Sequence, residues 1–251
     1  MTSHSDSPTP SFQQRPDGIH RLETGEEGLV ILTAGKRANP VSYPDDFLQA
    51  RRREKDFIAS LTGIEPNRVI LLDQVHGDTI HYIAAPPDDP DAPYPTGDGM
   101  MTAAPRICLV IRTADCVPLF VFDPRTRALG AAHAGWRGAR LGIAAKLIRE
   151  MHRAFGSRPA DMRAYILPSI GPESYRVGTD VADFFPEDTI ERGGEYYLDL
   201  WANIERQVTG EGLPRGNVHN VRVCTLAHRG EFYSYRGKDA GRNLNVGFLA
   251  F

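Results

Sequence analysis

The hydrophobic pattern of the middle of the chain predicts three neighbouring strands. Apolar runs at 107–111, 119–122 and 128–132 are separated by polar or turn-forming residues. In the first run both sets of alternating positions are apolar, which is typical of a strand buried on both faces. The second run ends at Asp123-Pro124, and the third is followed directly by His133. We therefore expect a buried sheet here, with polar side chains at the ends of its strands.

Shorter patterns predict further strands and helices on both sides of this stretch. Apolar runs favour strands at 28–34, 68–75, 164–167 and 218–225, with 79–83 continuing the strand at 68–75 after a break. Helical spacing of apolar residues favours helices at 45–61, 139–155, 179–185 and 198–208. The Pro- and Asp-rich stretch 84–99 is expected to be a loop. Strands and helices do not alternate strictly, which favours a layered α/β fold with a mixed sheet over a doubly wound parallel one.

Length and composition are typical of a globular protein of one or two domains. The 251 residues, 41% hydrophobic and 24% charged, suffice for one large or two small domains. Because motifs from both halves are expected to build one site, we predict a single domain over 19–251. Residues 1–18 lack the apolar core of a signal peptide and are predicted to be a disordered tail.

Charge and cysteine content exclude several classes of protein. A formal charge of -3 gives no general attraction to nucleic acid or to an anionic membrane. Three cysteines are too few and odd in number for a disulfide framework, which indicates a reducing compartment. No apolar stretch is long enough to span a bilayer. We expect a cytoplasmic protein that binds neither nucleic acid nor membrane.

Candidate chemistry gathers at three predicted strand ends. Cys116 and His133 each follow an apolar run, and His76 lies in QVHGD at a third break. One thiolate and two imidazoles suit zinc or copper, and three protein ligands leave a coordination position open. From spacing alone the alternative is favoured, because cysteines and histidines in apolar surroundings are more often packed core residues.

Longer motifs identify a family. The chain resembles the laccase-domain family, also called YfiH-like or multicopper polyphenol oxidase, in QVHGD, DGMMT, TADCVPLFVFDP, AAHAGWRG, SIGPESYRVG and the C-terminal FYSYR. The resemblance runs from about residue 68 to 248 and implies a layered α/β/β/α fold. It also implies that His76, Cys116 and His133 bind one catalytic zinc. The activity it implies is on purine nucleosides: phosphorolysis of adenosine, inosine and methylthioadenosine, and deamination of adenosine.

The histidine content bears on copper chemistry. The chain has eight histidines and no His-x-His pair, whereas laccases proper supply their copper centres largely through such pairs. A single blue-copper site with Met100 or Met101 as axial donor remains open, and Cu²⁺ can occupy a zinc site because it binds such donors more tightly. We expect Zn²⁺ as cofactor, with Cu²⁺ possible in the same site.

Two carboxylates are candidates for proton transfer beside Cys116. Deamination needs a water made acidic by zinc and a nearby acid. The usual deaminase signature, H-x-E with P-C-x-x-C, is absent, so Asp98 and Asp115 are the candidate catalytic residues. Asp98 alternatively closes a turn, and Asp115 alternatively orients a metal ligand.

Binding of nucleoside and phosphate needs aromatic and cationic side chains. Guanidinium groups match phosphate well, although an arginine can equally hold a buried carboxylate, and aromatic rings more often pack in the core. The candidates inside family-like motifs are Gln74, Trp136, Arg137, Arg176, Arg236 and Arg242.

The sequence leaves alternative activities and the oligomeric state of the protein open. Bacterial members of the family resemble factors that edit peptidoglycan precursors, so an amide hydrolase is one alternative and a copper-dependent polyphenol oxidase is another. A binding protein without turnover is disfavoured, because a purely structural zinc usually takes four protein ligands. We expect a purine nucleoside and phosphate as partners of a monomer or small homo-oligomer.

Overall fold

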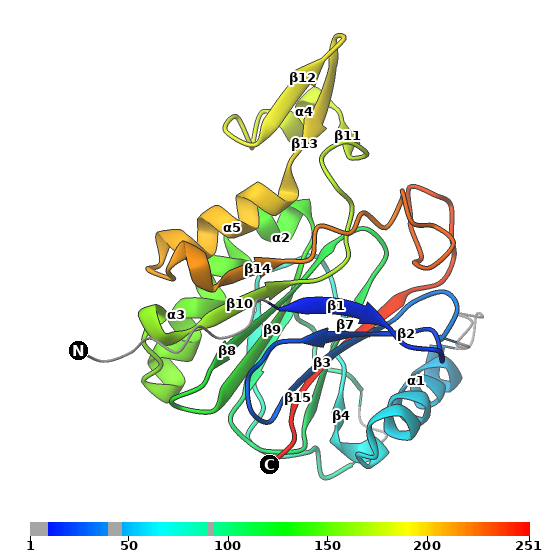
Figure 1. The fold of residues 1–251 in the computed structure, drawn as a ribbon, viewed down its shortest axis with the longest axis vertical. Helices are drawn as coiled ribbons and strands as arrows, with labels where there is room; N and C mark the ends of the chain where they lie inside the picture. Colours follow the sequence, from blue (N-terminus) through cyan, green and yellow to red (C-terminus); the bar gives the residue numbers. More distant parts are fainter. Residues whose placement is uncertain (1–9, 40–46, 90–92) are drawn as a thin grey trace.

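Two six-stranded sheets form the body of the molecule (Figure 1). The computed structural model describes residues 10–39, 47–89 and 93–251. The first sheet has the spatial order β1 (Ser11–Gln14), β2 (Ile19–Glu23), β3 (Leu29–Ala34), β15 (Asn243–Leu249), β7 (Cys108–Thr113) and β4 (Val69–Ile70). The second has the order β14 (Val218–Asn220), β10 (Arg163–Ile166), β8 (Val117–Asp123), β9 (Ala128–Ala134), β6 (Gly99–Thr102) and β5 (Ile80–Tyr82).

Both sheets are mixed. In the first sheet β4 pairs parallel with β7 whereas β15 pairs antiparallel with β7, and in the second β5 pairs parallel with β6 whereas β8 and β9 are antiparallel. The helices are α1 (Phe47–Thr62), α2 (Trp136–Arg140), α3 (Ile143–Phe155), α4 (Thr179–Ala182) and α5 (Leu200–Gly210), with short 3₁₀ turns at Pro66–Arg68, Pro159–Asp161 and Arg215–Asn217. Across these described ranges, none of the helices has the length and apolar character that crossing a bilayer requires.

Alternating side chains on the central strands build the core between the sheets. Leu109 and Ile111 of β7 point to the same side and pack in one cluster with Phe120 and Phe122 of β8. All four are at most 2% exposed. Burying a side chain of this size stabilises the fold by roughly 1.5–3 kcal/mol.

The outer faces of the two sheets are covered by helices. On the first sheet Val110 packs with Ile58 of α1. On the second sheet Val121 packs with Leu147 of α3 and Ile204 of α5. Helix, sheet, sheet and helix therefore follow one another as four layers, which confirms the α/β/β/α fold class. β7, β8 and β9 are largely apolar on both faces because both faces are buried.

A small three-stranded sheet extends from one end of this sandwich. It has the order β11 (Arg176–Val177), β13 (Glu195–Leu198) and β12 (Thr189–Arg192), and α4 lies against it (Figure 1). The helix predicted over 179–185 is shorter than expected, and β11 to β13 were not predicted.

The prediction that 79–83 continues the strand at 68–75 is wrong. β4 belongs to the first sheet and β5 to the second, so the segment between them crosses from one sheet to the other. His76 turns the chain with a left-handed φ of 62°. In this crossing segment Asp73 forms a single parallel bridge with Thr96, and the N–H groups of Val75, His76 and Gly77 bond to a side chain described below.

The helix predicted over 139–155 is two helices. α2 ends at Arg140 and α3 begins at Ile143. Gly142 separates them with a φ of 76°, a conformation that glycine adopts without the steric cost of a side chain. The apolar spacing continues across the break, which is why the pattern alone did not reveal it.

The N-terminal tail predicted over 1–18 is wrong for Ser11–Gln14. These residues form β1 and pair antiparallel with β2. Residues 1–9 of the predicted tail lie outside the described residues, as do 45–46 of the helix predicted over 45–61 and 90–92 of the loop predicted over 84–99.

Two predictions near the C-terminus differ in extent. The strand expected over 218–225 stops at Asn220, because Arg222 has a φ of 51° and its N–H bonds to the Asn220 side chain. β15 was not predicted, because asparagines interrupt its apolar pattern. Asn245 is fully buried there and donates to the carbonyl of Ile111, which satisfies its polar side chain within the sheet.

Candidate metal centre

The three predicted donors come together at one end of the sandwich. His76 lies in the crossing between the sheets, Cys116 in the turn from β7 to β8, and His133 near the end of β9. Their ligand atoms all lie within 4.8 Å of one another, and Cys116 Sγ is 3.9 Å from His76 Nε2. Donors around a tetrahedral zinc lie about 3.3–3.7 Å apart, given bonds of about 2.0–2.3 Å. The donor types therefore suit zinc, and the donor atoms lie somewhat wider apart than they would around a bound tetrahedral ion.

A buried carboxylate holds two of these donors in place. Asp98, immediately before β6, is fully buried. Its oxygens accept hydrogen bonds from the backbone N–H groups of Val75, His76 and Gly77 at 3.1, 2.9 and 2.7 Å. The same carboxylate lies 2.8 Å from His133 Nδ1. It thereby fixes the crossing and leaves His133 Nε2 as the nitrogen for a metal.

Electrostatics around Cys116 favour its thiolate. Burial raises the pKa of the Cys116 thiol, but the positive charge of His133 and hydrogen bonds to His133 and His76 outweigh it and lower the pKa below its usual range. Cys108, which faces α1, shows the contrast: burial raises the pKa of its thiol to about 12. The thiolate form is the one that binds a metal, so the environment selects Cys116 as the donor.

Two glycines allow the elements to approach closely. A Cβ at Gly135 would lie 2.9 Å from Cys116 Sγ and from His76 Cδ2, and one at Gly138 would lie 2.9 Å from the Gly77 carbonyl. Their small size lets the start of α2 pack directly on the donors.

Asp115 connects the donor turn to the C-terminal part of the chain. It is buried and has a φ of 87°. Its two oxygens accept hydrogen bonds from the Thr225 hydroxyl at 2.7 Å and from the Arg236 backbone N–H at 2.8 Å. The structure thus places it beside Cys116 as a link between segments. Proton transfer by Asp98 or Asp115 stays a prediction.

The predicted arginines differ in their surroundings. Arg176 pairs with Glu195 at 2.7 Å. Arg242 donates to the carbonyls of Ala240 and Gly241 in its own loop, at 3.0 and 2.9 Å.

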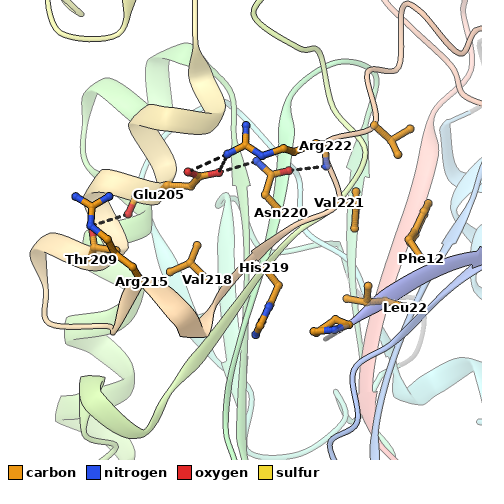
Figure 2. A pocket seen from close by; sticks show the side chains of 12 residues that line it. Phe12, Leu22, Glu205, Thr209, Arg215, Val218, His219, Asn220, Val221 and Arg222 are labelled. Atoms are coloured by element: carbon orange, nitrogen blue, oxygen red, sulfur yellow. Dashed lines mark hydrogen bonds and ion pairs between the residues drawn. The ribbon is translucent and has the colours of Figure 1, made fainter. Parts of the chain in front are cut away.

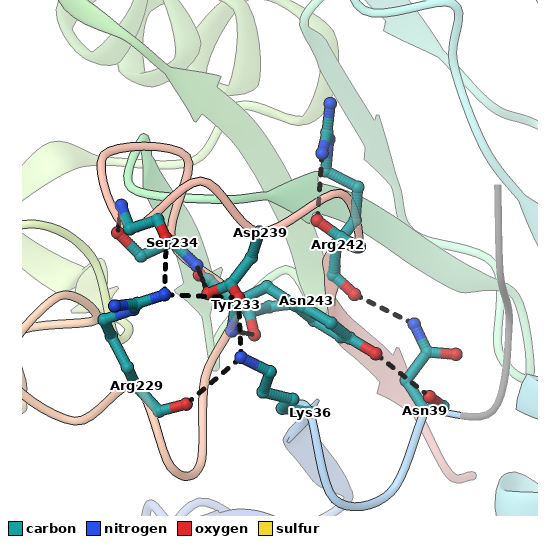
Figure 3. Close-up of polar contacts among 10 residues, drawn as sticks. Lys36, Asn39, Arg229, Tyr233, Ser234, Asp239, Arg242 and Asn243 are labelled. Atoms are coloured by element: carbon teal, nitrogen blue, oxygen red, sulfur yellow. Dashed lines mark hydrogen bonds and ion pairs between the residues drawn. The ribbon is translucent and has the colours of Figure 1, made fainter.

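The loop that carries Arg242 is tied to the end of β3. Figure 3 shows Lys36 between the Arg229 carbonyl and the Asp239 carboxylate, which it contacts at 2.6 Å, and Asn39 donating to the Arg242 carbonyl at 2.8 Å. This network fixes the loop against the first sheet.

Arg137 and Arg236 lie over aromatic rings. The Arg137 guanidinium is 4.5 Å from the centre of the Trp136 ring, and that of Arg236 is 5.1 Å from the centre of the Tyr175 ring. Arg236 Nη1 also donates to the Arg176 carbonyl at 2.6 Å.

Gln74 and Trp136 already have partners in the protein. The Gln74 amide exchanges two hydrogen bonds of 2.9 Å with the backbone of Arg112, as a neighbouring strand would. Trp136 is stacked on Phe184, with 6.5 Å between ring centres and 11° between planes, and packs against the core. Binding of substrate by either residue stays a prediction.

A cavity of about 540 Å³ lies elsewhere, between β1 and β14 (Figure 2). Phe12, Leu22, His219 and Arg222 are among its lining residues, and none of the three donors is. The candidate metal centre is therefore a separate feature at the strand ends.

The contacts that join the distant segments around the candidate metal centre were not predicted from the sequence. The link from Thr225 through Asp115 to Arg236 joins positions 110 and 121 residues apart. The hydroxyl of Tyr175, whose pKa is raised in part by the charge of Cys116, was also missed as a polar group near the donors. The short motif containing Thr225 carried no signal by which the link could have been found.

Known proteins support one family assignment. The family model described as "Multi-copper polyphenol oxidoreductase laccase" matches residues 36–250. A protein of Bacteroides thetaiotaomicron named purine nucleoside phosphorylase is 32% identical over 225 residues, covering 82% of this chain and 83% of that protein. One of the same name from Deinococcus radiodurans is 35% identical over 190 residues, covering 74% and 70%.

Solved structures agree with the fold. YlmD from Geobacillus stearothermophilus has a TM-score of 0.83 and 26% identity, covering 96% of this chain and 99% of that one. YfiH from Bacillus licheniformis has a TM-score of 0.75 and 26% identity, covering 97% of both chains. With a family model that spans most of its length, the chain belongs to the multi-copper polyphenol oxidoreductase laccase family, whose YfiH-like architecture it shares.

Proposed function

We propose that this protein is a metal-dependent purine nucleoside phosphorylase. The observation that carries the proposal is the convergence of His76, Cys116 and His133 in a chain whose relatives bear that name. In this reaction the C1′–N9 bond of the nucleoside breaks, a phosphate oxygen forms a bond to C1′, and the purine leaves with the electron pair and accepts a proton.

Zinc is the proposed ion. Two imidazoles and one thiolate are donors that zinc accepts in tetrahedral sites, and three protein ligands leave one position for a small molecule. When bound, zinc would supply a Lewis acid that polarises a substrate oxygen or lowers the pKa of water towards about 7.

The protein's own residues would orient the metal donors and hold the segments around them in place. Asp98 fixes the His133 imidazole and the backbone that carries His76. Asp115 ties the turn that carries Cys116 to the loop at Arg236. Both sets of contacts are already formed in the structure, as a preorganised site needs.

The proposed substrates are adenosine, inosine and methylthioadenosine for phosphorolysis. We also propose deamination of adenosine at the same site, in which water replaces the 6-amino group and ammonia leaves. The support for this finer assignment is the match of QVHGD, TADC and AHAGWRG to the family motifs.

The test is product analysis of zinc-loaded protein. Adenosine, inosine and methylthioadenosine are each incubated with and without phosphate, and free base, sugar 1-phosphate and ammonia are quantified. We expect base and sugar 1-phosphate only with phosphate, the sugar being ribose for adenosine and inosine and 5-methylthioribose for methylthioadenosine, and ammonia from adenosine in either case. Cys116→Ala should lose the metal and all three products, whereas Cys108→Ala, which removes a thiol facing α1, should retain the metal.

Two outcomes would contradict the proposal. One is a fully metal-loaded protein that releases no base from any of the three nucleosides. The other is full metal retention by Cys116→Ala. Hydrolysis of a peptidoglycan precursor by the same preparation would favour the alternative amide hydrolase.

A further inference from the structure

The four predicted arginines divide into two groups by what surrounds them. The guanidinium of Arg176 is neutralised by Glu195, and that of Arg242 bonds to carbonyls of its own loop. Arg137 and Arg236 form no ion pair with a carboxylate in residues 10–39, 47–89 and 93–251. Both are exposed and held over aromatic rings. Stacking restrains a guanidinium while its N–H edges stay available to an oxyanion.

Both of these arginines are anchored close to the donors. Arg137 lies in the first turn of α2, whose preceding Gly135 contacts Cys116 and His76. The backbone N–H of Arg236 bonds to the carboxylate of Asp115, the residue next to Cys116. Two segments about 100 positions apart in the chain therefore bring positive charge to the same end of the sandwich.

Tyr175 is the aromatic residue under the Arg236 guanidinium. Its side chain is buried except for 9% of the residue's surface, and the Arg236 guanidinium lies over its ring. No residue of the described ranges forms a hydrogen bond with its hydroxyl. Burial raises the pKa of this hydroxyl above its usual range, the charge of Cys116 adds to the effect, and Arg236 and Arg137 partly oppose it. The hydroxyl therefore stays protonated and can donate.

We propose that Arg137, Tyr175 and Arg236 form a subsite for a tetrahedral oxyanion beside the His76, Cys116 and His133 donors. Two guanidinium groups and one hydroxyl donor match the charge and the several acceptor oxygens of a phosphate dianion. In the proposed phosphorylase, on which this identification of the anion rests, the subsite holds the phosphate whose oxygen bonds to C1′. Arg176 and Arg242 are not part of it.

The experiment measures phosphate dependence in three variants, Arg137→Ala, Tyr175→Phe and Arg236→Ala. Each is zinc-loaded, its metal content is checked, and nucleoside cleavage is followed with phosphate varied at saturating nucleoside. We expect the KM for phosphate to rise by ~10-fold or more for each arginine variant and by roughly 3- to 10-fold for Tyr175→Phe, the loss typical of one hydrogen bond. Ammonia release from adenosine should change much less.

Arg192→Ala is the control. Arg192 is also exposed and lies 5.6 Å from the centre of an aromatic ring, that of Tyr197, but it belongs to the small three-stranded sheet and pairs with Glu173. Its removal should leave the KM for phosphate unchanged. The subsite is overturned if the three variants keep the wild-type KM for phosphate, or if only their KM for nucleoside changes. It is likewise overturned if Arg176→Ala or Arg242→Ala produces the larger loss.

Direct binding separates this proposal from the proposed function. Line broadening of inorganic phosphate in ³¹P NMR reports binding to the zinc-loaded protein without turnover. Phosphate binding that is lost in the three variants of a protein that cleaves no nucleoside would support the subsite and refute the phosphorylase. Phosphate-dependent cleavage with unchanged phosphate binding in all three would refute the subsite alone.

Discussion

Asp98 is the single residue on which the positions of two metal donors depend. Its carboxylate accepts three backbone N–H groups of the crossing and contacts His133 Nδ1. We expect Asp98→Asn to weaken zinc binding by ~10- to 100-fold, because the amide cannot accept all of these hydrogen bonds and no longer carries charge beside the imidazole. Competition with a chelator measures this affinity. Unchanged affinity in a folded variant would show that Asp98 is not the group that orients His133.

Gly135 provides space rather than a functional group. A methyl group there would lie 2.9 Å from Cys116 Sγ and His76 Cδ2, so one of the donors has to move in Gly135→Ala. A misplacement of about 1 Å near reacting groups costs up to ~100-fold in rate, and we expect a loss of this order in nucleoside cleavage. Gly210→Ala is the control, since its Cβ would meet nothing within 4 Å. Equal rates in the two variants would contradict the argument.

At the scale of elements, β1 belongs to the folded core. Phe12 packs against the cluster between the sheets and is stacked on His20, with ring centres 5.2 Å apart. We expect Phe12→Ala to lower the free energy of unfolding by roughly 1–2 kcal/mol, since the ring is partly buried. Urea unfolding measures the change, and Gln13→Ala, on the exposed side of the same strand, should change it by less than ~0.5 kcal/mol. Equal stability of the two variants would indicate that β1 contributes little.

At the scale of the whole molecule, the arrangement of donors limits the copper chemistry. Among the described residues, His76, Cys116 and His133 form the one group of three or more metal-ligating side chains. A laccase-type multicopper centre needs more donors than one such group provides. We therefore expect protein reconstituted with Cu²⁺ to hold about one tightly bound ion per chain, as elemental analysis would measure, and to oxidise phenols slowly at most.

Two measurements together would contradict the prediction for copper: the copper content per chain and the rate of phenol oxidation. More than one tightly bound copper per chain, together with phenol oxidation as fast as nucleoside cleavage, would favour the polyphenol oxidase alternative. Loss of the single ion in His133→Ala would identify its site in either case, and His152→Ala, which alters a histidine of α3, serves as control.

The sequence by itself determined the central strands and the three donors. Runs that are apolar on both faces arise only where both faces are buried, so β7, β8 and β9 were readable from local pattern. His76, Cys116 and His133 stand at the ends of such runs, in motifs long enough to be recognised. That these three side chains lie within 4.8 Å of one another agrees with the pattern.

Tertiary structure alone decided how the crossing runs, where β15 inserts and which of the predicted arginines pairs with a carboxylate. The contacts responsible join distant positions: Asp115 reaches Arg236 across 121 residues, and Asn245 reaches Ile111 across 134. A local pattern reports which face of an element is buried, but not which distant group will satisfy a polar side chain there. Arg176 and Arg137 accordingly look alike in sequence, and only the position of Glu195 distinguishes them.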